Sequence, residues 1–272
     1  MDQLSDKKLG LIGGGHITEI ILDNLIGNHA ISAEQVIVSN RSNKRLIYLK
    51  SKFGVETTPD NQIAIQQSDL IFVNVPPSNV HAVILDLAGA DLRLDQIVIS
   101  IAAGIPLRDY GPIGSHQPLV RALPNPPSRI GQGLIALHLN QAITAEQRDL
   151  LHSLFSTMGQ VVYIEEAHFN VVTALTSPVA TYLFFEALID AGVRGGIKRP
   201  TATKIAAQTI LGSMGVWQST DSSPHSLMAE ASTPAGISVE SLFTLEKLGF
   251  KPAVMEAIAQ GAARAKEVGR KT

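Results

Sequence analysis

The sequence predicts an α/β protein in two parts, a doubly wound parallel sheet over residues 1–165 and an all-helical domain over residues 166–272. Three observations support this fold class. In the first part, short runs of branched apolar residues alternate with helical patterns, as in sheets whose strands are joined by crossover helices. After residues 161–164 no strand-like run follows, and helical spacing continues to the end. A glycine-rich turn at residues 13–15 separates the first strand from the first helix.

The expected strands of the first part are residues 8–13, 35–39, 69–75, 96–101, 119–123, 134–139 and 161–164. Helical patterns between the early strands cover residues 15–25, 43–53 and 78–87. The run at 69–75 is almost continuously apolar, which is typical of a strand covered on both faces. Pro76 and Pro77 end this run, because proline cannot continue a hydrogen-bonded ladder.

The expected helices of the second part are residues 167–191, 200–218, 238–248 and 251–266. The segment 171–193 carries only Glu186 and Asp190 as charges, so its length and composition approach those of a membrane span. Hydroxyl residues and Pro178 interrupt it, and neither an aromatic belt nor a basic flank follows. We therefore expect a helix buried between protein layers, and no membrane contact.

Composition excludes several classes of protein. Lys and Arg number 22 against 24 Asp and Glu, a net charge of −2 that gives no electrostatic case for nucleic acid. The chain has no cysteine, so a disulfide framework and a thiolate nucleophile are excluded. No histidine lies at metal-ligand spacing from a carboxylate, so no metal is expected. The first residues show no apolar signal segment, which favours a cytoplasmic protein.

The turn between the first strand and first helix reads Gly-Gly-Gly-His-Ile-Thr. Gly13 permits a tight turn, and Gly15 lets the backbone approach a pyrophosphate at the helix N-terminus, where His16 and Ile17 follow. The third fingerprint position is Thr18, where a small Gly or Ala is usual. The position of this turn favours a dinucleotide site of the Rossmann type over an ordinary tight turn.

The end of the second strand predicts which dinucleotide is bound. An NAD site places an acid there for the ribose hydroxyl, whereas this chain has Asn40, Arg41 and Ser42 and no acid. An arginine flanked by hydroxyl and amide groups suits a 2′-phosphate, so we predict NADP(H). The alternative is that Arg41 and Lys44 merely begin a solvated helix.

Residues 10–17 read Gly-Leu-Ile-Gly-Gly-Gly-His-Ile, residues 39–42 Ser-Asn-Arg-Ser, and residues 121–127 Arg-Ala-Leu-Pro-Asn-Pro-Pro. Over essentially the whole chain, such segments resemble the pyrroline-5-carboxylate reductase family. Residues 10–17 are similar to its opening Gly-Phe-Ile-Gly-x-Gly-Asn-Met, and residues 39–42 match its NADP-recognising segment. Residues 100–105 resemble its Ser-Ile-Ala-Ala-Gly-Val, and residues 121–127 its Arg-Val-Met-Pro-Asn-Thr-Pro. Further segments at 186–188, 206–212 and 245–250 also fit.

The resemblance implies a Rossmann domain followed by a helical domain that dimerises, and NADPH-dependent reduction of a cyclic imine carboxylate such as pyrroline-5-carboxylate. On the family's motifs, further cofactor contacts are expected at Val75, Pro76, Pro77, Ala102, Ala103 and Asn125. The motifs likewise place substrate binding at Thr176, Ala235, Gly236 and Ile237, and the hydroxyl that orients the ring nitrogen at Ser238.

The chain departs from the family pattern where substrate is expected. The family's Ser-Pro-Gly-Gly-Thr-Thr is replaced in this chain by Thr-Pro-Ala-Gly-Ile-Ser at residues 233–238. The family's Val-Lys-Pro-Gln is replaced by Val-Pro-Pro-Ser at residues 75–78, so the lysine is lost. Ala235 and Ile237 would alter the pocket shape, while Gly236 keeps one backbone amide. Ser238 also suits a helix N-cap, a role compatible with substrate binding.

These departures leave alternatives open. A β-hydroxyacid dehydrogenase needs a lysine in the first long helix of the helical domain, but no lysine lies between Lys52 and Lys198. A non-catalytic NADP-binding paralogue acting through protein interaction fits the altered loops, because function lies in sites and not in folds. A reductase of a substituted pyrroline fits them equally.

Overall fold

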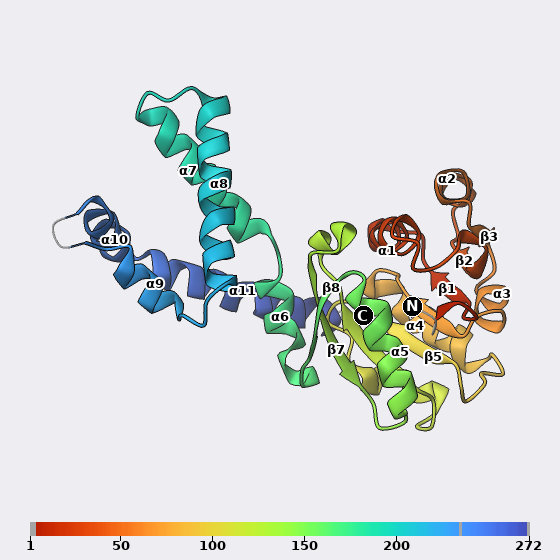
Figure 1. Ribbon diagram of the computed structural model, residues 1–272. Helices are drawn as coiled ribbons and strands as arrows, with labels where there is room; N and C mark the ends of the chain where they lie inside the picture. Colours follow the sequence, from red (N-terminus) through yellow and green to blue (C-terminus); the bar gives the residue numbers. More distant parts are fainter. Residues whose placement is uncertain (1–3, 234–235, 271–272) are drawn as a thin grey trace. The chain divides into compact units, whose positions relative to one another are not determined.

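The computed structural model describes residues 4–233 and 236–270 (Figure 1). The chain forms two compact units. One contains the described residues up to Thr176 together with those from Ala259 onward, and the other spans Ser177–Ile258. The boundary expected after residue 165 stays a prediction, and residues 166–176, which it assigns to the helical domain, belong to the first unit. The return of the last segment to that unit was not predicted.

The first unit is built on an eight-stranded sheet in the order β3-β2-β1-β4-β5-β6-β7-β8. Its strands are β1 (Leu9–Ile12), β2 (Val36–Ser39), β3 (Glu56–Thr58), β4 (Leu70–Val73), β5 (Ile97–Ser100), β6 (Leu119–Leu123), β7 (Gly133–Leu139) and β8 (Gly159–Tyr163). Strand order reverses between β1 and β4, the point where doubly wound sheets open a crevice at their carboxyl edge. The predicted α/β fold class is confirmed.

The expectation of a wholly parallel sheet is wrong for the last two strands. β7 runs antiparallel to β6, and β8 runs parallel to β7. The connection from β6 to β7 contains only the short 3-10 segment η4 (Pro126–Ile130). A parallel return needs a crossover of a dozen or more residues, so this short connection brings the chain back antiparallel.

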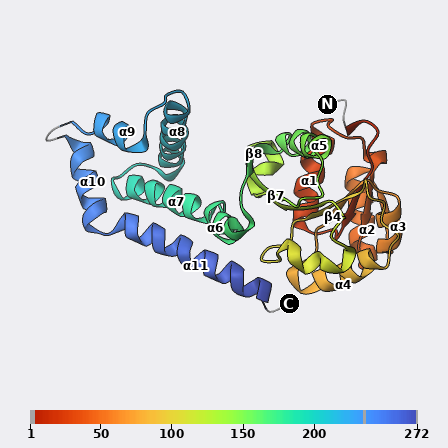
Figure 2. The same cartoon turned by 90° about the horizontal axis from the view of Figure 1, so that it is seen from below.

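Helices cover both faces of the sheet, as Figure 2 shows for α1 and α5 on one face and α4 on the other. The helices of the first unit are α1 (His16–Gly27), α2 (Asn43–Phe53), α3 (Asn61–Gln66), α4 (Pro77–Ala88), α5 (Ala145–Ser156) and α6 (Phe169–Leu175), with part of α11 (Phe250–Arg270). The 3-10 segments are η2 (Ala33–Gln35), η3 (Leu107–Ile113), η4 and η5 (Glu166–His168). Residues of β4 alternate between the two apolar cores, which explains its continuous apolar run.

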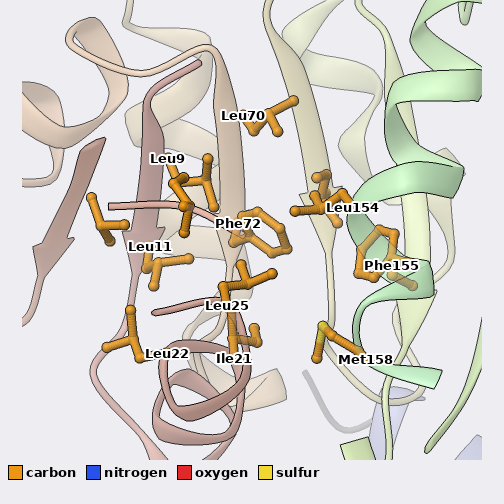
Figure 3. Close-up of a cluster of buried hydrophobic side chains, with 14 of the residues drawn as sticks. Leu9, Leu11, Ile21, Leu22, Leu25, Leu70, Phe72, Leu154, Phe155 and Met158 are labelled. Atoms are coloured by element: carbon orange, nitrogen blue, oxygen red, sulfur yellow. The ribbon is translucent and has the colours of Figure 1, made fainter. Parts of the chain in front are cut away.

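The larger core lies under α1 and α5 (Figure 3). Phe72 of β4 and Phe155 of α5 meet edge to face, with ring centroids 6.2 Å apart. Both rings are fully buried, so this pair ties α5 to the middle of the sheet.

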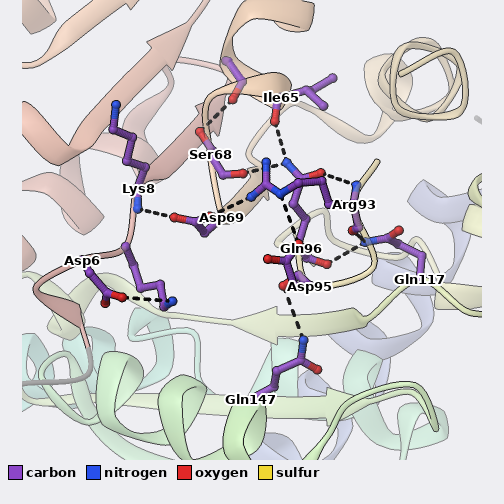
Figure 4. A network of polar contacts seen from close by, with 12 residues as sticks. Asp6, Lys8, Ile65, Ser68, Asp69, Arg93, Asp95, Gln96, Gln117 and Gln147 are labelled. Atoms are coloured by element: carbon purple, nitrogen blue, oxygen red, sulfur yellow. Dashed lines mark hydrogen bonds and ion pairs between the residues drawn. The ribbon is translucent and has the colours of Figure 1, made fainter. Parts of the chain in front are cut away.

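A network of hydrogen bonds and ion pairs lies at the edge of the sheet where the parallel strands begin (Figure 4). The Asp69 carboxylate accepts the Lys8 backbone N–H at 2.9 Å and pairs with the Arg93 guanidinium at 2.8 Å. The buried Gln96 amide donates to the carbonyl oxygens of Ile65 and Ser68. This edge is therefore held by satisfied polar groups, opposite to the edge where the glycine turn lies.

The end of α11 and the turn after β5 bring two backbone segments into close approach at Gly104 and Gly269. Gly104 has φ +78°, and a Cβ there would lie 2.7 Å from the carbonyl oxygen of Ala265. A Cβ on Gly269 would lie 2.0 Å from the carbonyl oxygen of Gly104. Only glycine at both positions permits this approach.

The second unit consists of α7 (Val179–Arg194), α8 (Arg199–Gln218), α9 (Pro224–Glu230), α10 (Ile237–Lys247) and the first part of α11. The single helix expected over 167–191 is wrong. α6 ends at Leu175 and α7 begins at Val179, because Pro178 lacks an N–H and disfavours a helical residue before it.

The second unit buries few apolar side chains in one protomer. Its buried cluster contains only Ile189, Ala202 and Ala206 among the described residues. Large apolar side chains lie exposed on the same helices, namely Tyr182, Leu183, Leu211, Met214, Phe243, Leu248 and Met255. Two of them, Met214 and Met255, line a groove of about 800 Å³ whose wall is mostly apolar. Such a large exposed apolar surface marks an interaction site.

Candidate active site

The glycine turn joins β1 to α1 at the carboxyl edge of the sheet. Gly13 has φ +104°, and a Cβ there would lie 2.6 Å from the carbonyl oxygen of Asn74. By contrast, a Cβ on Gly15 would meet no atom of the described residues within 4 Å. Gly13 is therefore required by the fold, whereas the space beside Gly15 is open for a ligand.

Thr18 occupies the third fingerprint position without disturbing the turn. Its side chain is fully buried, and its hydroxyl donates to the carbonyl oxygen of Gly13 and accepts from the Asn74 amide at 3.3 Å. The hydroxyl thus braces the turn where a smaller residue is usual.

A cavity of about 460 Å³ opens at the turn. Among the predicted cofactor residues, its lining includes Gly13, Gly15, Asn40, Arg41, Ser42, Val75 and Pro76. Sequence reasoning missed Ile12, Gly14, Ser39, Arg45, Asn61, Asn74, Asn79 and Val83, which also line it. Ser39 ends β2 and Asn74 follows β4, the two strands that flank β1, so the strand-end rule could have found them. None of the described residues in this lining is acidic.

The carboxyl end of β2 supplies a cation to this cavity. Arg41 is exposed, and none of the described residues forms an ion pair or hydrogen bond with its guanidinium. Ser42 is the N-cap residue of α2, and its hydroxyl makes no capping bond. A free guanidinium beside a helix N-terminus provides the donors that a 2′-phosphate requires.

Arg45 has a different role from that of Arg41. Its guanidinium donates to the carbonyl oxygen of Gly14 and pairs with the Glu19 carboxylate. Glu19 also accepts from Tyr48 at 3.0 Å and from Lys52 at 3.1 Å. This cluster links α1 to α2, and through the Arg45 bond to Gly14 it also holds the glycine turn that precedes α1.

The Glu19 carboxyl is strongly perturbed by this cluster. Burial alone would raise its pKa, but hydrogen bonds from Arg45, Lys52 and Tyr48 outweigh it and lower the pKa to about 2. Because the folded pKa is depressed, Glu19 stabilises the fold above its ordinary pKa near 4.5, and this stability is lost as pH falls toward 2.

We expect Glu19→Gln to lower the free energy of unfolding at pH 7 by about 1–3 kcal/mol, because it removes a paired charge and leaves Arg45 without its carboxylate. Urea denaturation at pH 7 and pH 3 measures the effect. The free energies of unfolding of the variant and the parent protein should differ less at pH 3 than at pH 7. Glu34→Gln is the control, because Glu34 is exposed and has no ion pair with any described residue. If the free energy of unfolding differed between variant and parent by the same amount at pH 7 and pH 3, the ion-pair explanation would be contradicted.

The other predicted cofactor residues lie around the turn without lining this cavity. His16 and Ile17 open α1, and Pro77 opens α4 directly after β4. Ala102 is buried in the smaller apolar core, and Ala103 follows it after β5. Their contact with a cofactor stays a prediction.

Asn125 follows β6 and is already engaged within the protein. Its amide donates to the carbonyl oxygen of Thr176 at 3.2 Å, and its side-chain oxygen accepts from the Leu134 N–H at 3.1 Å. The side chain thus ties the end of α6 to the sheet, and its predicted cofactor contact stays a prediction.

The predicted substrate residues belong to both units. Thr176 lies in the first unit, and its hydroxyl donates to the carbonyl oxygen of Val172 at 2.8 Å. Gly236, Ile237 and Ser238 lie in the second unit, and Ala235 lies outside the described residues. The alternative of Ser238 as N-cap is wrong, because Gly236 is the N-cap of α10. Ser238 is exposed in the first turn, and no described residue bonds its hydroxyl.

Comparison with known proteins agrees with this arrangement. Residues 166–268 match the family described as pyrroline-5-carboxylate reductase dimerisation, and residues 8–104 match the family described as NADP oxidoreductase coenzyme F420-dependent. Over 266 residues the chain is 34% identical to a pyrroline-5-carboxylate reductase of Synechocystis, covering 97% of this chain and 99% of that protein. The chain belongs to the pyrroline-5-carboxylate reductase family.

Solved structures of the pyrroline-5-carboxylate reductase family share the fold. The enzyme of Coxiella burnetii matches with a TM-score of 0.86 at 28% identity, over 96% of this chain and 98% of that one. The Plasmodium falciparum enzyme, solved with NADP bound, matches with a TM-score of 0.86 at 25% identity, over 97% of this chain and 99% of that one.

The residues of the cavity fit NADP. Gly15 leaves room at the N-terminus of the twelve-residue helix α1, where a diphosphate is favoured. Asn74 carries a buried side-chain oxygen that has no hydrogen-bond partner among the described residues, and this residue lines the cavity. Arg41 supplies the positive charge for the additional phosphate.

Proposed function

We propose that this protein reduces pyrroline-5-carboxylate to proline with NADPH. The observation that carries the proposal is the cavity at the glycine turn, whose described lining residues include Arg41 and no acid, in a chain that matches reductases of this name over nearly its full length. The cofactor supplies a hydride for the carbon of a C=N bond.

The chain's own residues bind and orient the reactants. The turn at Gly13 and Gly15 receives the diphosphate, and Arg41 with Ser42 receives the 2′-phosphate. In this proposal the Gly236 amide, which donates to the carbonyl oxygen of Thr233 at 2.9 Å in the protein alone, exchanges that bond for the substrate carboxylate, and the Ser238 hydroxyl bonds the ring nitrogen. A protonated imine is already electrophilic, so orientation by a hydroxyl suffices and no strong protein acid is needed.

Ser238→Ala tests the placement of the substrate loop. We expect kcat/KM to fall by roughly ten- to a hundredfold, the effect of one hydrogen bond to a charged group. Because Ser238 is exposed and unbonded to the described residues, the thermal midpoint should not change. The assay follows NADPH oxidation with pyrroline-5-carboxylate and with a ring-substituted analogue. Unchanged turnover would place the substrate elsewhere.

The same assay separates the alternative functions. Turnover of pyrroline-5-carboxylate supports the proposal, and faster turnover of the substituted ring favours a specialised substrate. Absence of turnover with both, while NADPH still binds, would instead favour the non-catalytic paralogue.

We propose that the helices of the second unit form the interface of a homodimer. A dimerisation family covers residues 166–268, which supports homo-oligomerisation. One segment of the described chain, Glu166–Arg194, is long and apolar enough to span a membrane, and only 6% of its most apolar window is buried in one protomer. We attribute this apolar surface to a second copy of the chain, and on that basis propose a cytoplasmic enzyme.

Leu183→Glu tests the interface. The Leu183 side chain is 71% exposed in one protomer, so a charge there should not disturb the protomer itself. Burying that charge between subunits is costly, and we expect light scattering to show monomers at micromolar concentration. The control is Leu94→Glu, because Leu94 is 72% exposed in the first unit. A Leu183→Glu protein that stays dimeric would remove this face from the interface.

A further inference from the structure

The first unit contains a second cavity that the proposed reaction does not use. It measures about 760 Å³ and shares no lining residue with the cavity at the glycine turn. Its walls come from the turn after β5, from η3, from β6, from η5 and the start of α6, and from the end of α11. All of these segments belong to the first unit.

A buried guanidinium forms part of the wall. Arg121 projects from β6 and is only 5% exposed. Its Nη1 donates to the Glu166 carboxylate at 3.3 Å, and its guanidinium carbon lies 4.6 Å from the centre of the Phe169 ring. The same Glu166 oxygen also accepts from the Leu107 N–H at 2.7 Å. Among the described residues, no acceptor bonds the other guanidinium nitrogens, Nε and Nη2.

Two further polar groups of the wall are unpaired. The Asn170 side-chain oxygen is buried and has no hydrogen-bond partner among the described residues. Buried polar atoms are bonded in the great majority of cases, so this acceptor indicates a donor from outside the chain. Lys266 of α11 is exposed, and no described residue pairs with its ammonium group.

The charges of the cavity wall indicate the chemical class of its ligand. The wall holds three cations, Arg108, Arg121 and Lys266, and two carboxylates, Asp109 and Glu166. Arg108 pairs with Asp109 at 3.7 Å and Arg121 with Glu166 at 3.3 Å, so the described wall carries one net positive charge. A ligand with two carboxylates and one ammonium group carries the complementary charge. We propose that this cavity binds an acidic α-amino acid, with its carboxylates on Arg121 and Lys266 and its ammonium group on Asn170 and Glu166.

Such a ligand would act on the connections between the units. The chain leaves the first unit after Thr176, at the end of α6, and returns at Ala259 in α11. The cavity wall includes residues of both helices. A ligand that bridges Asn170 and Lys266 therefore stabilises the docking of α11, and we expect it to raise the thermal midpoint.

The test is calorimetric titration of the full-length protein, saturated with NADPH, with L-glutamate. Glutarate lacks the ammonium group and L-glutamine lacks the second carboxylate. We expect L-glutamate to bind in the millimolar range or tighter, and each of the other two to bind at least about tenfold more weakly. Equal affinity for all three would contradict the assignment of the ligand class.

Variants locate the site. Lys266→Glu and Asn170→Leu should each lower the affinity for L-glutamate at least about tenfold. Lys266 is exposed, so its variant keeps the test valid even if Asn170→Leu fails to fold. Lys50→Glu, exposed on α2, is the matched control. Ser238→Ala should keep the affinity unchanged, since it touches only the proposed substrate loop. Absence of binding, binding that survives Lys266→Glu, or binding lost in Ser238→Ala would overturn the proposal.

Discussion

Gly15→Val should leave the protein folded and weaken NADPH binding at least a hundredfold. Gly15 has an extended backbone conformation that valine adopts readily, and an added Cβ meets no protein atom within 4 Å. The cost to the fold is limited to a poorer N-cap, about 1 kcal/mol. The added methyl groups would instead occupy the space that the diphosphate needs at the start of α1.

Fluorescence titration with NADPH and a thermal melt together measure this effect. Gly111→Val is the matched control, because a Cβ there also meets no atom within 4 Å and Gly111 does not line the cavity. The control should keep both affinity and stability. Normal NADPH affinity in Gly15→Val would mean that the diphosphate does not bind at this turn.

Arg41→Asp should reverse the preference between the two nicotinamide cofactors. The Arg41 guanidinium has no described protein partner, so its loss removes phosphate contacts without breaking the fold. Charge-assisted bonds contribute about 1.5–3 kcal/mol each, and the new carboxylate would repel the phosphate. We expect the KM for NADPH to rise roughly a hundredfold, whereas the KM for NADH changes little.

The comparison with Lys44→Asp decides between the two interpretations of this segment. Lys44 is also exposed near the start of α2, but it does not line the cavity. If Arg41 and Lys44 only begin a solvated helix, both variants behave alike. An equal loss of NADPH and NADH activity in Arg41→Asp would refute the assignment of the 2′-phosphate site.

Much of the first unit could be predicted from the sequence because its strands are strongly patterned. The apolar run that contains β4 and the glycine turn after β1 lie where they were expected. β3 was missed because Glu56–Thr58 is short and polar. α5 was missed although Thr144 and Gln147 form a capping box at its start, a signal that the sequence does carry.

The candidate site was predicted only in part, for physical reasons. Strand ends and glycines are local signals, so they placed Arg41 and Gly13 at the cavity. The bonds that hold Asn125 link segments far apart in the chain, and no local pattern reveals them. The contact between Gly104 and Gly269 likewise joins backbone segments far apart in the chain, and no local pattern reveals that the two meet.

That glycine contact has a consequence for how the protein is made. Residues 259–270 complete a unit whose other members were all synthesised before the helices of the second unit. During synthesis on the ribosome, the first unit therefore cannot complete its fold until α11, which is made last, has left the ribosome. Contacts of such long sequence separation slow folding and prolong exposure of apolar surface. The protein should depend on chaperones during synthesis more than a domain with contiguous sequence does.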